Sequence, residues 1–374
     1  MLFIVSTMPQ LTEPFRRSVF GGLPLAVLGA CALVSACGSE ASAPVVTPSA
    51  PPTPVVVEEV GAPQPIQVPS GLKSAPIEAT PSQEALPAVE AQAPDREDWA
   101  GTELREERYP DGKPKLSRRV RRTEDGIENH GPFRKWATNG VLLEEGTFRA
   151  GEKEGAYVVR HENGLVKSEI HYLRGREHGR KREWGEYGVL LSDATLVDGV
   201  LDGEERTWWP DKNPRTLSTW KLGVLDGPSR VWHGNGIVAE EGQSVAGKRE
   251  GTWTYRSSED RLALVENYLL GRLHGVTTEY DAEGRKSAER EYRDGRASGV
   301  HREFWPSGKP RAETTFVDGK PQGPSARWYE DGVKECEGGL VGGQREGRWS
   351  FWKSDGSLDV AQSGDYRAGA RVGP

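Results

Sequence analysis

A carboxylate recurs at 24-residue intervals through most of this 374-residue chain, and repeated carboxylates can bind calcium or transfer protons. The carboxylates are Glu145, Glu169, Asp193, Glu241, Glu289, Glu313 and Glu337. Calcium sites need several carboxylates within one loop, and paired catalytic carboxylates need two different environments. Each interval here supplies a single acid. We therefore expect these side chains to accept hydrogen bonds or to pair with a lysine or arginine, and we predict no metal site, no cofactor and no catalytic residue.

The histidines and cysteines form no enzyme motif either. His130, His178 and His274 each stand just before a glycine that opens a 24-residue unit, so we interpret them as turn residues rather than metal ligands. Cys336 is the only cysteine after residue 37, which excludes a disulfide within the repeats and favours a packed strand position. The chain contains no GxSxG, HExxH, CxxC or P-loop motif. We therefore predict that the protein is not an enzyme.

Glycines follow the same 24-residue spacing in two ladders. The first ladder is Gly131, Gly155, Gly179, Gly203, Gly227, Gly251, Gly275, Gly299, Gly323 and Gly347. The second ladder is Gly151, Gly175, Gly199, Gly223, Gly247, Gly271, Gly295, Gly319 and Gly343. Each of these glycines precedes the next glycine of the first ladder by four residues. A fixed period over most of a chain is typical of one supersecondary unit stacked many times. We interpret the first ladder as the hinges of that stack.

A third glycine, nine residues into the unit, marks a turn. Its members are Gly140, Gly164, Gly188, Gly236, Gly284, Gly308, Gly332 and Gly356, with Lys212 in its place in one unit. Asparagine or aspartate often precedes it, as in Asn139-Gly140 and Asp331-Gly332. Such pairs supply the positive φ angles of tight hairpin turns. Each unit is therefore predicted to be one β-hairpin.

Two aromatic columns flank this turn. The first, five residues into the unit, is Trp136, Trp184, Trp208, Trp232, Tyr280, Phe304, Trp328 and Trp352. The second, seventeen residues in, is Phe148, Tyr172, Trp220, Tyr268, Tyr292 and Phe316, with Leu196 and Leu340 as substitutes. Strand alternation predicts that the face of the second column also carries Leu142, Val166, Ile170, Leu190, Leu264 and Ala288. We expect the aromatics to form a continuous apolar band on one face and the carboxylates to lie on the other.

These landmarks resemble the bacterial variant of the MORN repeat. One complete set is Gly299, Phe304, Gly308, Glu313, Phe316, Gly319 and Gly323. The resemblance covers about Glu103 to Gly373, or around eleven units. It implies an all-β fold, an elongated, twisted, single-layer antiparallel sheet of about eleven stacked β-hairpin repeats. At ~4.8 Å per strand the sheet would be on the order of 100 Å long.

The two ends depart from the period. The first unit, which contains Tyr109 and Gly112, reaches Gly131 four residues late. The last unit, which contains Trp352 and Gly356, shifts its tail by two residues. Atypical terminal units are expected where a stack must be capped.

Residues 1–36 resemble a lipoprotein signal peptide. A basic pair, Arg16 and Arg17, precedes an apolar stretch from Val19 to Val34, which small residues and a cysteine follow. Cys31 and Cys37 both fit a lipobox. We favour Cys37 as the lipidated residue because cleavage there removes the whole apolar segment, and Cys31 is the alternative.

Residues 37–100 are predicted to be a Pro/Ala/Glu-rich disordered tether, and residues 101–374 the repeat domain. Ser39–Ala100 holds nine acidic residues against Lys73 and Arg96, a charge of −7, and cannot bury enough apolar surface to fold alone. From Gly101 onward, 45 basic and 46 acidic residues leave a charge of −1. Such a mixed-charge surface favours no nucleic acid partner. Translation starts at Met1 or Met8.

These features predict a lipid-anchored, non-enzymatic binding or scaffold module. We expect an outer membrane lipoprotein that faces the periplasm or the cell exterior and binds an unknown envelope protein or polymer. Two alternatives belong to other classes. Members of the variant MORN family are often catalogued as antitoxins of toxin–antitoxin pairs. A toxin gene next to the gene of this chain would favour that alternative. A protein that binds or hydrolyses cell-wall polymer would use the carboxylates with aromatic platforms such as Trp208-Trp209.

Overall fold

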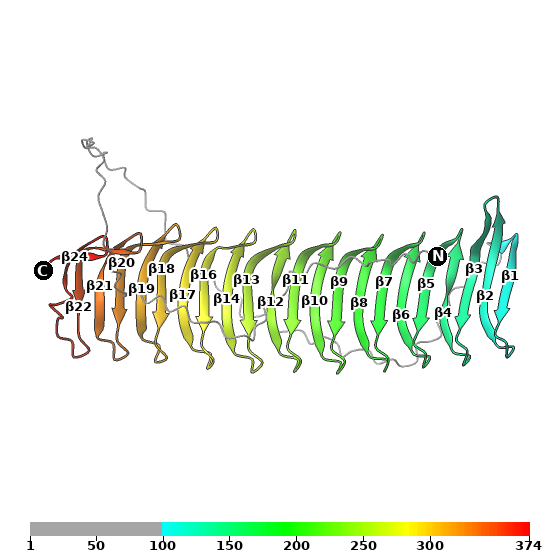
Figure 1. Ribbon diagram of the computed structural model, residues 1–374, viewed down its shortest axis with the longest axis horizontal. Helices are drawn as coiled ribbons and strands as arrows, with labels where there is room; N and C mark the ends of the chain where they lie inside the picture. Colours follow the sequence, from blue (N-terminus) through cyan, green and yellow to red (C-terminus); the bar gives the residue numbers. More distant parts are fainter. Residues whose placement is uncertain (1–98) are drawn as a thin grey trace, which may run out of the picture. The chain divides into compact units, whose positions relative to one another are not determined.

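The computed structural model describes residues 99–374, which form one antiparallel β-sheet (Figure 1). The first half contains β1 (Thr102–Arg108), β2 (Pro114–Thr123), β3 (Gly126–Trp136), β4 (Leu142–Arg149), β5 (Glu152–Arg160), β6 (Val166–Leu173), β7 (Arg176–Trp184), β8 (Leu190–Val197), β9 (Val200–Trp208), β10 (Pro214–Lys221), β11 (Val224–Trp232) and β12 (Val238–Val245). The second half contains β13 (Lys248–Arg256), β14 (Leu262–Leu269), β15 (Arg272–Leu273), β16 (Gly275–Tyr280), β17 (Lys286–Arg293), β18 (Arg296–Phe304), β19 (Pro310–Val317), β20 (Lys320–Trp328), β21 (Lys334–Val341), β22 (Gln344–Phe351), β23 (Gly364–Arg367) and β24 (Ala370–Gly373).

The sheet grows strand by strand in the order of the sequence. Each strand pairs antiparallel with its successor, for example β3 with β4, β4 with β5, and β5 with β6. β15 and β16 are the exception, because both pair with β14 as two parts of one strand position. The strands lie side by side in a single layer (Figure 1). The predicted all-β, single-layer sheet of stacked hairpins is therefore confirmed.

Turns of two residues form one long side of the sheet, here called the tight-turn edge. Between β4 and β5 the turn is Ala150–Gly151, and φ is positive at both residues, 50° and 81°. Two successive positive φ angles are typical of a type I′ turn, which matches the twist of the flanking strands. The second glycine ladder therefore occupies the tight turns.

Turns of five residues form the opposite side, here called the five-residue-turn edge. Between β3 and β4 the turn is Ala137–Val141, where the N–H of Gly140 donates to the carbonyl of Ala137 at 2.9 Å. Gly140 has a φ of 88°, whereas Asn139 acts through its side-chain oxygen, which accepts from the N–H of Val141 at 3.0 Å. The prediction that Asn-Gly pairs form the tight hairpin turns is therefore wrong. Asparagine here closes a longer turn by a side-chain hydrogen bond.

The first glycine ladder lies inside strands. In β5, Gly155 has a φ of 73°, and the register with β4 jumps from Thr147 opposite Glu154 to Glu145 opposite Val158. Three residues of β5 thus face a single residue of β4, which is a β-bulge. Glycine adopts the positive φ that this bulge requires at low cost. The interpretation of the first ladder as hinges between hairpins is therefore wrong.

Register shifts near the five-residue turns also change which residues share a face. Leu142 pairs with Trp136, Val166 with Arg160, and Leu190 with Trp184. These apolar residues therefore lie on the face of the first aromatic column, here called the first face. The prediction that they share a face with the second column is wrong. The pairing register shifts by one residue at the start of each of these strands, and such a shift moves a side chain to the opposite face. Ile170, Leu264 and Ala288 keep the predicted alternation with the second column, on the second face.

Both faces carry a thin apolar core. On the first face the buried cluster is Val158, Val166, Trp184, Leu190 and Trp208. On the second face it is Cys336, Trp349, Phe351 and Tyr366, with Leu340 packed against it. A single apolar band with an opposite charged face was predicted. The structure instead distributes apolar and charged residues over both faces.

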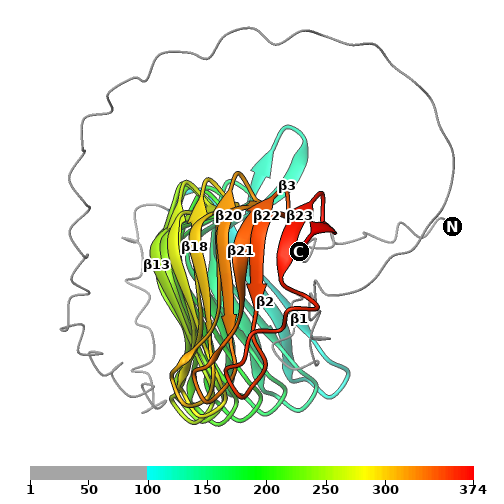
Figure 2. The same cartoon turned by 90° about the vertical axis from the view of Figure 1, so that its left-hand side faces the viewer.

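The two ends of the sheet differ from the middle. β2 and β3 are 10 and 11 residues long against 8 and 9 for β4 and β5, so their hairpin projects beyond its neighbours (Figure 2). β2 and β3 together contain four residues more than β4 and β5, so Gly131 follows Gly112 four residues later than in the regular units. At the other end, Trp352 forms an isolated bridge with Leu358, and the backbone N–H of Phe351 donates to Ser363 Oγ at 3.0 Å. β23 starts only at Gly364, which accounts for the shifted tail.

Candidate binding pocket at the tight-turn edge

The repeated carboxylates lie on the first face beside cations. Glu169, which is 6% exposed, accepts from Arg182 at 2.6 Å. The other pairs are Arg160–Glu145, Arg180–Asp193, Arg230–Glu241, Lys286–Glu289, Arg302–Glu313 and Lys334–Glu337. Each of the seven carboxylates thus has a lysine or arginine partner, as expected. Five of these ion pairs cross-link neighbouring strands, whereas Lys286–Glu289 and Lys334–Glu337 lie within β17 and β21.

The three histidines before first-ladder glycines lie near the tight-turn edge, but the prediction that they are turn residues is wrong. His130 and His178 belong to β3 and β7, and His274 lies between β15 and β16, because the first-ladder glycines that follow them form bulges inside strands. The contacts of these histidines are Ala150 N–H to His130 Nδ1 at 3.1 Å, Asp294 N–H to His274 Nδ1 at 3.5 Å, and Asp198 Oδ1 to His178 Nδ1 at 3.7 Å. Each histidine therefore contacts the next tight turn along the sheet.

Backbone hydrogen bonds fix the tight turns in a row. The N–H of each second-ladder glycine donates to a carbonyl of the preceding unit, as from Gly175 to Lys153 at 2.9 Å and from Gly295 to Leu273 at 2.8 Å. Successive tight turns are therefore held at a constant spacing, close to two strand widths, or ~10 Å. The edge presents its side chains on a regular backbone.

Three aromatic clusters on the second face recur every 96 residues. A ring lies directly over a glycine of the preceding strand in the pairs Gly146–Tyr157, Gly242–Trp253 and Gly338–Trp349, and any Cβ on these glycines would overlap the ring. A cation lies over each ring, namely Lys153, Arg249 and Arg345, at 3.7, 4.2 and 5.2 Å from the ring centroid. The rings are 4–5% exposed, so these clusters are packing contacts.

His301 occupies the same column as these rings. Its ring stacks on Phe316 at a centroid distance of 4.2 Å and approaches Tyr292 at 5.6 Å. Its Nε2 lies 2.9 Å from the carbonyl oxygen of Glu291, to which an Nε2–H group donates. Burial lowers the pKa of His301 below its ordinary value, although the hydrogen bond to Glu291 acts in the opposite direction. The imidazole is therefore held neutral over a wider pH range than a free histidine.

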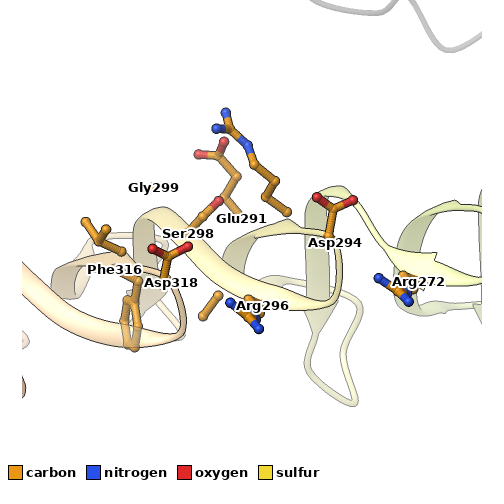
Figure 3. A pocket seen from close by; sticks show the side chains of 11 residues that line it. Arg272, Glu291, Asp294, Arg296, Ser298, Gly299, Phe316 and Asp318 are labelled. Atoms are coloured by element: carbon orange, nitrogen blue, oxygen red, sulfur yellow. The ribbon is translucent and has the colours of Figure 1, made fainter.

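A pocket of about 500 Å³ opens beside this stack at the tight-turn edge (Figure 3). It spans three neighbouring tight turns, from β15 through the β17–β18 turn to the β19–β20 turn. Its charged lining is Arg272, Glu291, Arg293, Asp294, Arg296 and Asp318. The wall is completed by Ala297, Ser298, Gly299, Phe316 and Val317. Phe316 thus joins the pocket to the His301 stack.

The pocket contains three arginines that have no ion-pair partner within residues 99–374. They are Arg272, Arg293 and Arg296. Figure 3 shows Asp294 between Arg272 and Arg296, and Asp318 next to Phe316. Asp294 Oδ1 lies 3.6 Å from His274 Nδ1.

This arrangement can bind polar groups of a partner. Guanidinium groups donate bidentate hydrogen bonds to carboxylate or phosphate oxygens, and the neighbouring carboxylates accept N–H or O–H groups. Within residues 99–374, no group of three histidine, cysteine, aspartate or glutamate side chains is placed to hold a metal ion. The pocket therefore favours recognition of a polar, partly anionic surface.

The other predicted site residues have packing positions. Trp184, Trp208 and Trp232 are buried on the first face, and Trp136, Trp328 and Trp352 are partly buried. Cys336 is buried in the second-face cluster. Cys31, Cys37 and the predicted signal peptide and tether up to residue 98 lie outside the described residues. Over the described part of the chain, no helix has the length and apolar character needed to cross a lipid bilayer.

Sequence reasoning missed the pocket. Its signal was present, because Arg272 and Arg296 occupy the same position of successive units, directly after the tight turn. A column of arginines on consecutive turns places their side chains about 10 Å apart. The interruption between β15 and β16 at His274 carried no comparable signal.

The comparison with family models agrees with the geometry of this region. Residues 298–318, which include most of β18, β19 and the following turn, match the MORN repeat variant. Residues 298–318 thus form one MORN repeat variant unit. MORN repeats are in general modules for binding, and the matched MORN unit supplies Ser298, Phe316 and Asp318 to the pocket wall.

None of the curated proteins compared with this chain matches it. Solved structures that are similar to this chain include the crystal structure of TcdB2-TccC3, with 9% sequence identity and a TM-score of 0.18. That match covers 67% of this chain and 16% of the other. The crystal structure of TcdB2-TccC3-Cdc42 matches with 9% identity and a TM-score of 0.17, over 71% of this chain and 17% of the other. The chain thus spans about a sixth of the length of these proteins.

Proposed function

We propose that this protein is a non-enzymatic binding module of the bacterial envelope that contacts its partner along the tight-turn edge. The observation that carries this function is the pocket of about 500 Å³ with its three unpaired arginines on neighbouring turns. Loops on one side of a repeat stack often form the binding surface, because their side chains vary without disturbing the stack. The partner is an envelope protein or polymer that presents anionic oxygens and hydrogen-bond donors to the pocket.

We further propose that a lipid on Cys37 anchors the protein in the outer membrane, with the repeats facing the periplasm or the cell exterior. Support comes from the lipobox-like sequence and the acidic, proline-rich segment behind it. Radiolabelled palmitate should be incorporated by the wild-type chain and lost when Cys31→Ala and Cys37→Ala are combined. Undiminished incorporation in that double variant would remove the anchor from the proposal.

Binding is tested by sedimentation of the purified full chain with isolated envelopes. The chain carries Cys31→Ala and Cys37→Ala so that the lipid makes no contribution. Adding Arg293→Glu with Arg296→Glu should lower the bound fraction about fivefold or more, because it reverses charge in the pocket.

The matched control adds Lys309→Glu with Lys353→Glu, which changes the net charge equally on the five-residue-turn edge. This control should sediment as the parent chain does. Equal loss of binding in both variants would indicate a diffuse charge effect and contradict a site at the pocket.

A further inference from the structure

Two arginines of the pocket lie opposite each other. Arg293 and Arg296 close the tight turn Asp294–Gly295 and are directly paired in the register of β17 with β18. Directly opposite residues of an antiparallel pair have Cβ atoms about 5 Å apart, and like charges at such positions destabilise the sheet. Within residues 99–374, neither guanidinium has a carboxylate at ion-pair distance. The pair therefore concentrates positive charge at one place in the pocket wall.

No other tight turn in residues 99–374 is closed by two cations. The corresponding pairs are Thr123–Gly126, Arg149–Glu152, Leu173–Arg176, Val197–Val200, Lys221–Val224, Val245–Lys248, Leu269–Arg272, Val317–Lys320, Val341–Gln344 and Arg367–Ala370. The hairpin geometry thus does not require two arginines at this position. Their presence at the one turn that forms the centre of the pocket points to a ligand with an anionic group.

A carboxylate lies next to the arginine pair on the same face. Glu291 and Ser298 are opposite each other, and the intervening pair of Tyr292 and Ala297 points to the other face. Two residues along a strand correspond to ~7 Å. The pocket therefore offers a negative group ~7 Å along the strand from its paired positive groups.

Gly299 leaves room for this carboxylate against the backbone. A Cβ on Gly299 would overlap Glu291 Oε2 and Cδ, so the carboxylate occupies the space that a side chain at position 299 would fill. Among residues 99–374, no lysine or arginine pairs with Glu291. The carboxylate can therefore accept hydrogen bonds from an ammonium group of a ligand.

The charged groups that line the pocket cancel. Three arginines face three carboxylates, namely Arg272, Arg293 and Arg296 against Glu291, Asp294 and Asp318. A polyanion would meet the carboxylates at close range, and a simple cation would meet the arginines. The pocket therefore fits a ligand that carries both charges.

We propose that the pocket binds the free end of an amino acid, a zwitterion in which a carboxylate and an ammonium group lie on one carbon. Its carboxylate accepts from Arg293 and Arg296, and its ammonium group donates to Glu291. This inference rests on the binding function proposed above and names the chemical group that the envelope partner presents.

An apolar wall is available for the side chain of such an amino acid. Val317 is 51% exposed, and Phe316 is held by its stack on His301 at a centroid distance of 4.2 Å. Figure 3 shows Phe316 on the side of the pocket away from Arg272. An amino acid with a small apolar side chain is therefore a suitable probe.

Isothermal titration calorimetry of the full chain tests the proposal with alanine, each enantiomer separately. N-acetylalanine lacks the ammonium group, and alaninamide lacks the carboxylate. At least one enantiomer of alanine should bind, and its two derivatives should bind about tenfold more weakly or worse, because each leaves one pole of the pocket without a partner.

Two variants separate the poles. Glu291→Gln should lower the affinity for alanine about tenfold and leave that for N-acetylalanine unchanged, whereas Arg293→Gln should weaken both. The matched control is Glu162→Gln, an exposed acid in the five-residue turn His161–Leu165, which should bind alanine as the wild-type chain does. Arg293→Gln also relieves the like-charge pair, so its melting temperature should be equal or higher, and lost binding then does not reflect unfolding.

Equal binding of alanine and N-acetylalanine would show a simple anion site and overturn the proposal. Binding of phosphoethanolamine without binding of alanine would assign the pocket to a longer zwitterion and also contradict it. Alanine fails to bind if the inference is wrong. If Arg293→Glu with Arg296→Glu still lowers sedimentation with envelopes in that case, the binding function stands and only the zwitterion inference fails.

Discussion

Single glycines decide where large rings can pack on the second face. Gly146, Gly242 and Gly338 leave room for the rings of Tyr157, Trp253 and Trp349, and a turn glycine such as Gly234 has no neighbour within 4 Å. The same residue type therefore has different consequences within one hairpin. The difference arises from packing rather than from backbone conformation, because none of these glycines has a positive φ.

Gly242→Ala should destabilise the sheet by about 1–3 kcal/mol, because its methyl group would overlap the buried ring of Trp253. Chemical denaturation followed by tryptophan fluorescence measures this change. Gly234→Ala is the matched control and should change the free energy of unfolding by less than about 0.5 kcal/mol. Equal effects of the two changes would refute the packing explanation.

A buried member of the repeated ion pairs should contribute more to the free energy of unfolding than an exposed one. Glu169→Ala leaves Arg182 without its partner in a site where the carboxylate is only 7% exposed, and should cost about 2–3 kcal/mol. Glu313→Ala removes a pair whose side chains are 39–43% exposed, and should cost about 1 kcal/mol or less. Thermal unfolding of the two variants at equal pH compares them, and a larger loss for Glu313→Ala would contradict this order.

His301 should make stability depend on pH. Its pKa is lowered in the folded state, so the unfolded chain binds more protons as the pH falls below about 6.5, the ordinary histidine pKa. The free energy of unfolding should therefore decrease from pH 7 towards pH 5. His301→Phe keeps a ring between Tyr292 and Phe316 and should make this decrease smaller. Denaturant titrations at several pH values measure both slopes, and identical slopes would count against this role of His301.

At the scale of elements, the two edges of the sheet consist of turns with different backbone conformations. Five-residue turns use one residue with positive φ, and the tight turns from β4–β5 onward use two. In the five-residue turn Trp209–Asn213, Lys212 has a φ of 73° where most units have glycine. The turn keeps its geometry with lysine at the expense of backbone strain.

Lys212→Gly should therefore raise the free energy of unfolding by about 0.5–1 kcal/mol, since glycine adopts a positive φ without a Cβ clash. Gly236→Lys is the reverse change in the next such turn, where a Cβ meets no atom within 4 Å, and should lower it by a similar amount. Differential scanning calorimetry gives both values. A lower melting temperature for Lys212→Gly would show that the lysine is not strained.

Much of the sheet could be predicted from the sequence, because the period and the alternation of Trp184, Leu196 and similar residues are local patterns. The bulge at Gly155 could not, since it depends on the register with β4 rather than on the sequence of β5 alone. Leu190 was placed on the wrong face for the same reason. The pocket also required the structure, because Phe316 and Arg272 come from different units.

At the scale of the whole sheet, stacking turns a local hairpin into a long surface. One unit contributes only two turns, whereas the row of tight turns places exposed apolar residues such as Leu222 and Leu270 and the arginine pocket on the same edge. Side chains on this edge can change without altering strand pairing, as the exchange of Leu222 for Asp294 between equivalent turns illustrates. We therefore propose that specificity for a partner is encoded along the edge.

Site-specific photo-crosslinking tests most directly whether partners bind the tight-turn edge, as we propose. A photoreactive amino acid replaces Arg296 or Lys320 on the tight-turn edge, or Lys309 on the five-residue-turn edge of the same units, in cells that produce the full chain. Positions 296 and 320 should form a discrete envelope adduct, and position 309 should form none. An adduct from position 309 without one from positions 296 and 320 would contradict a binding role for the tight-turn edge.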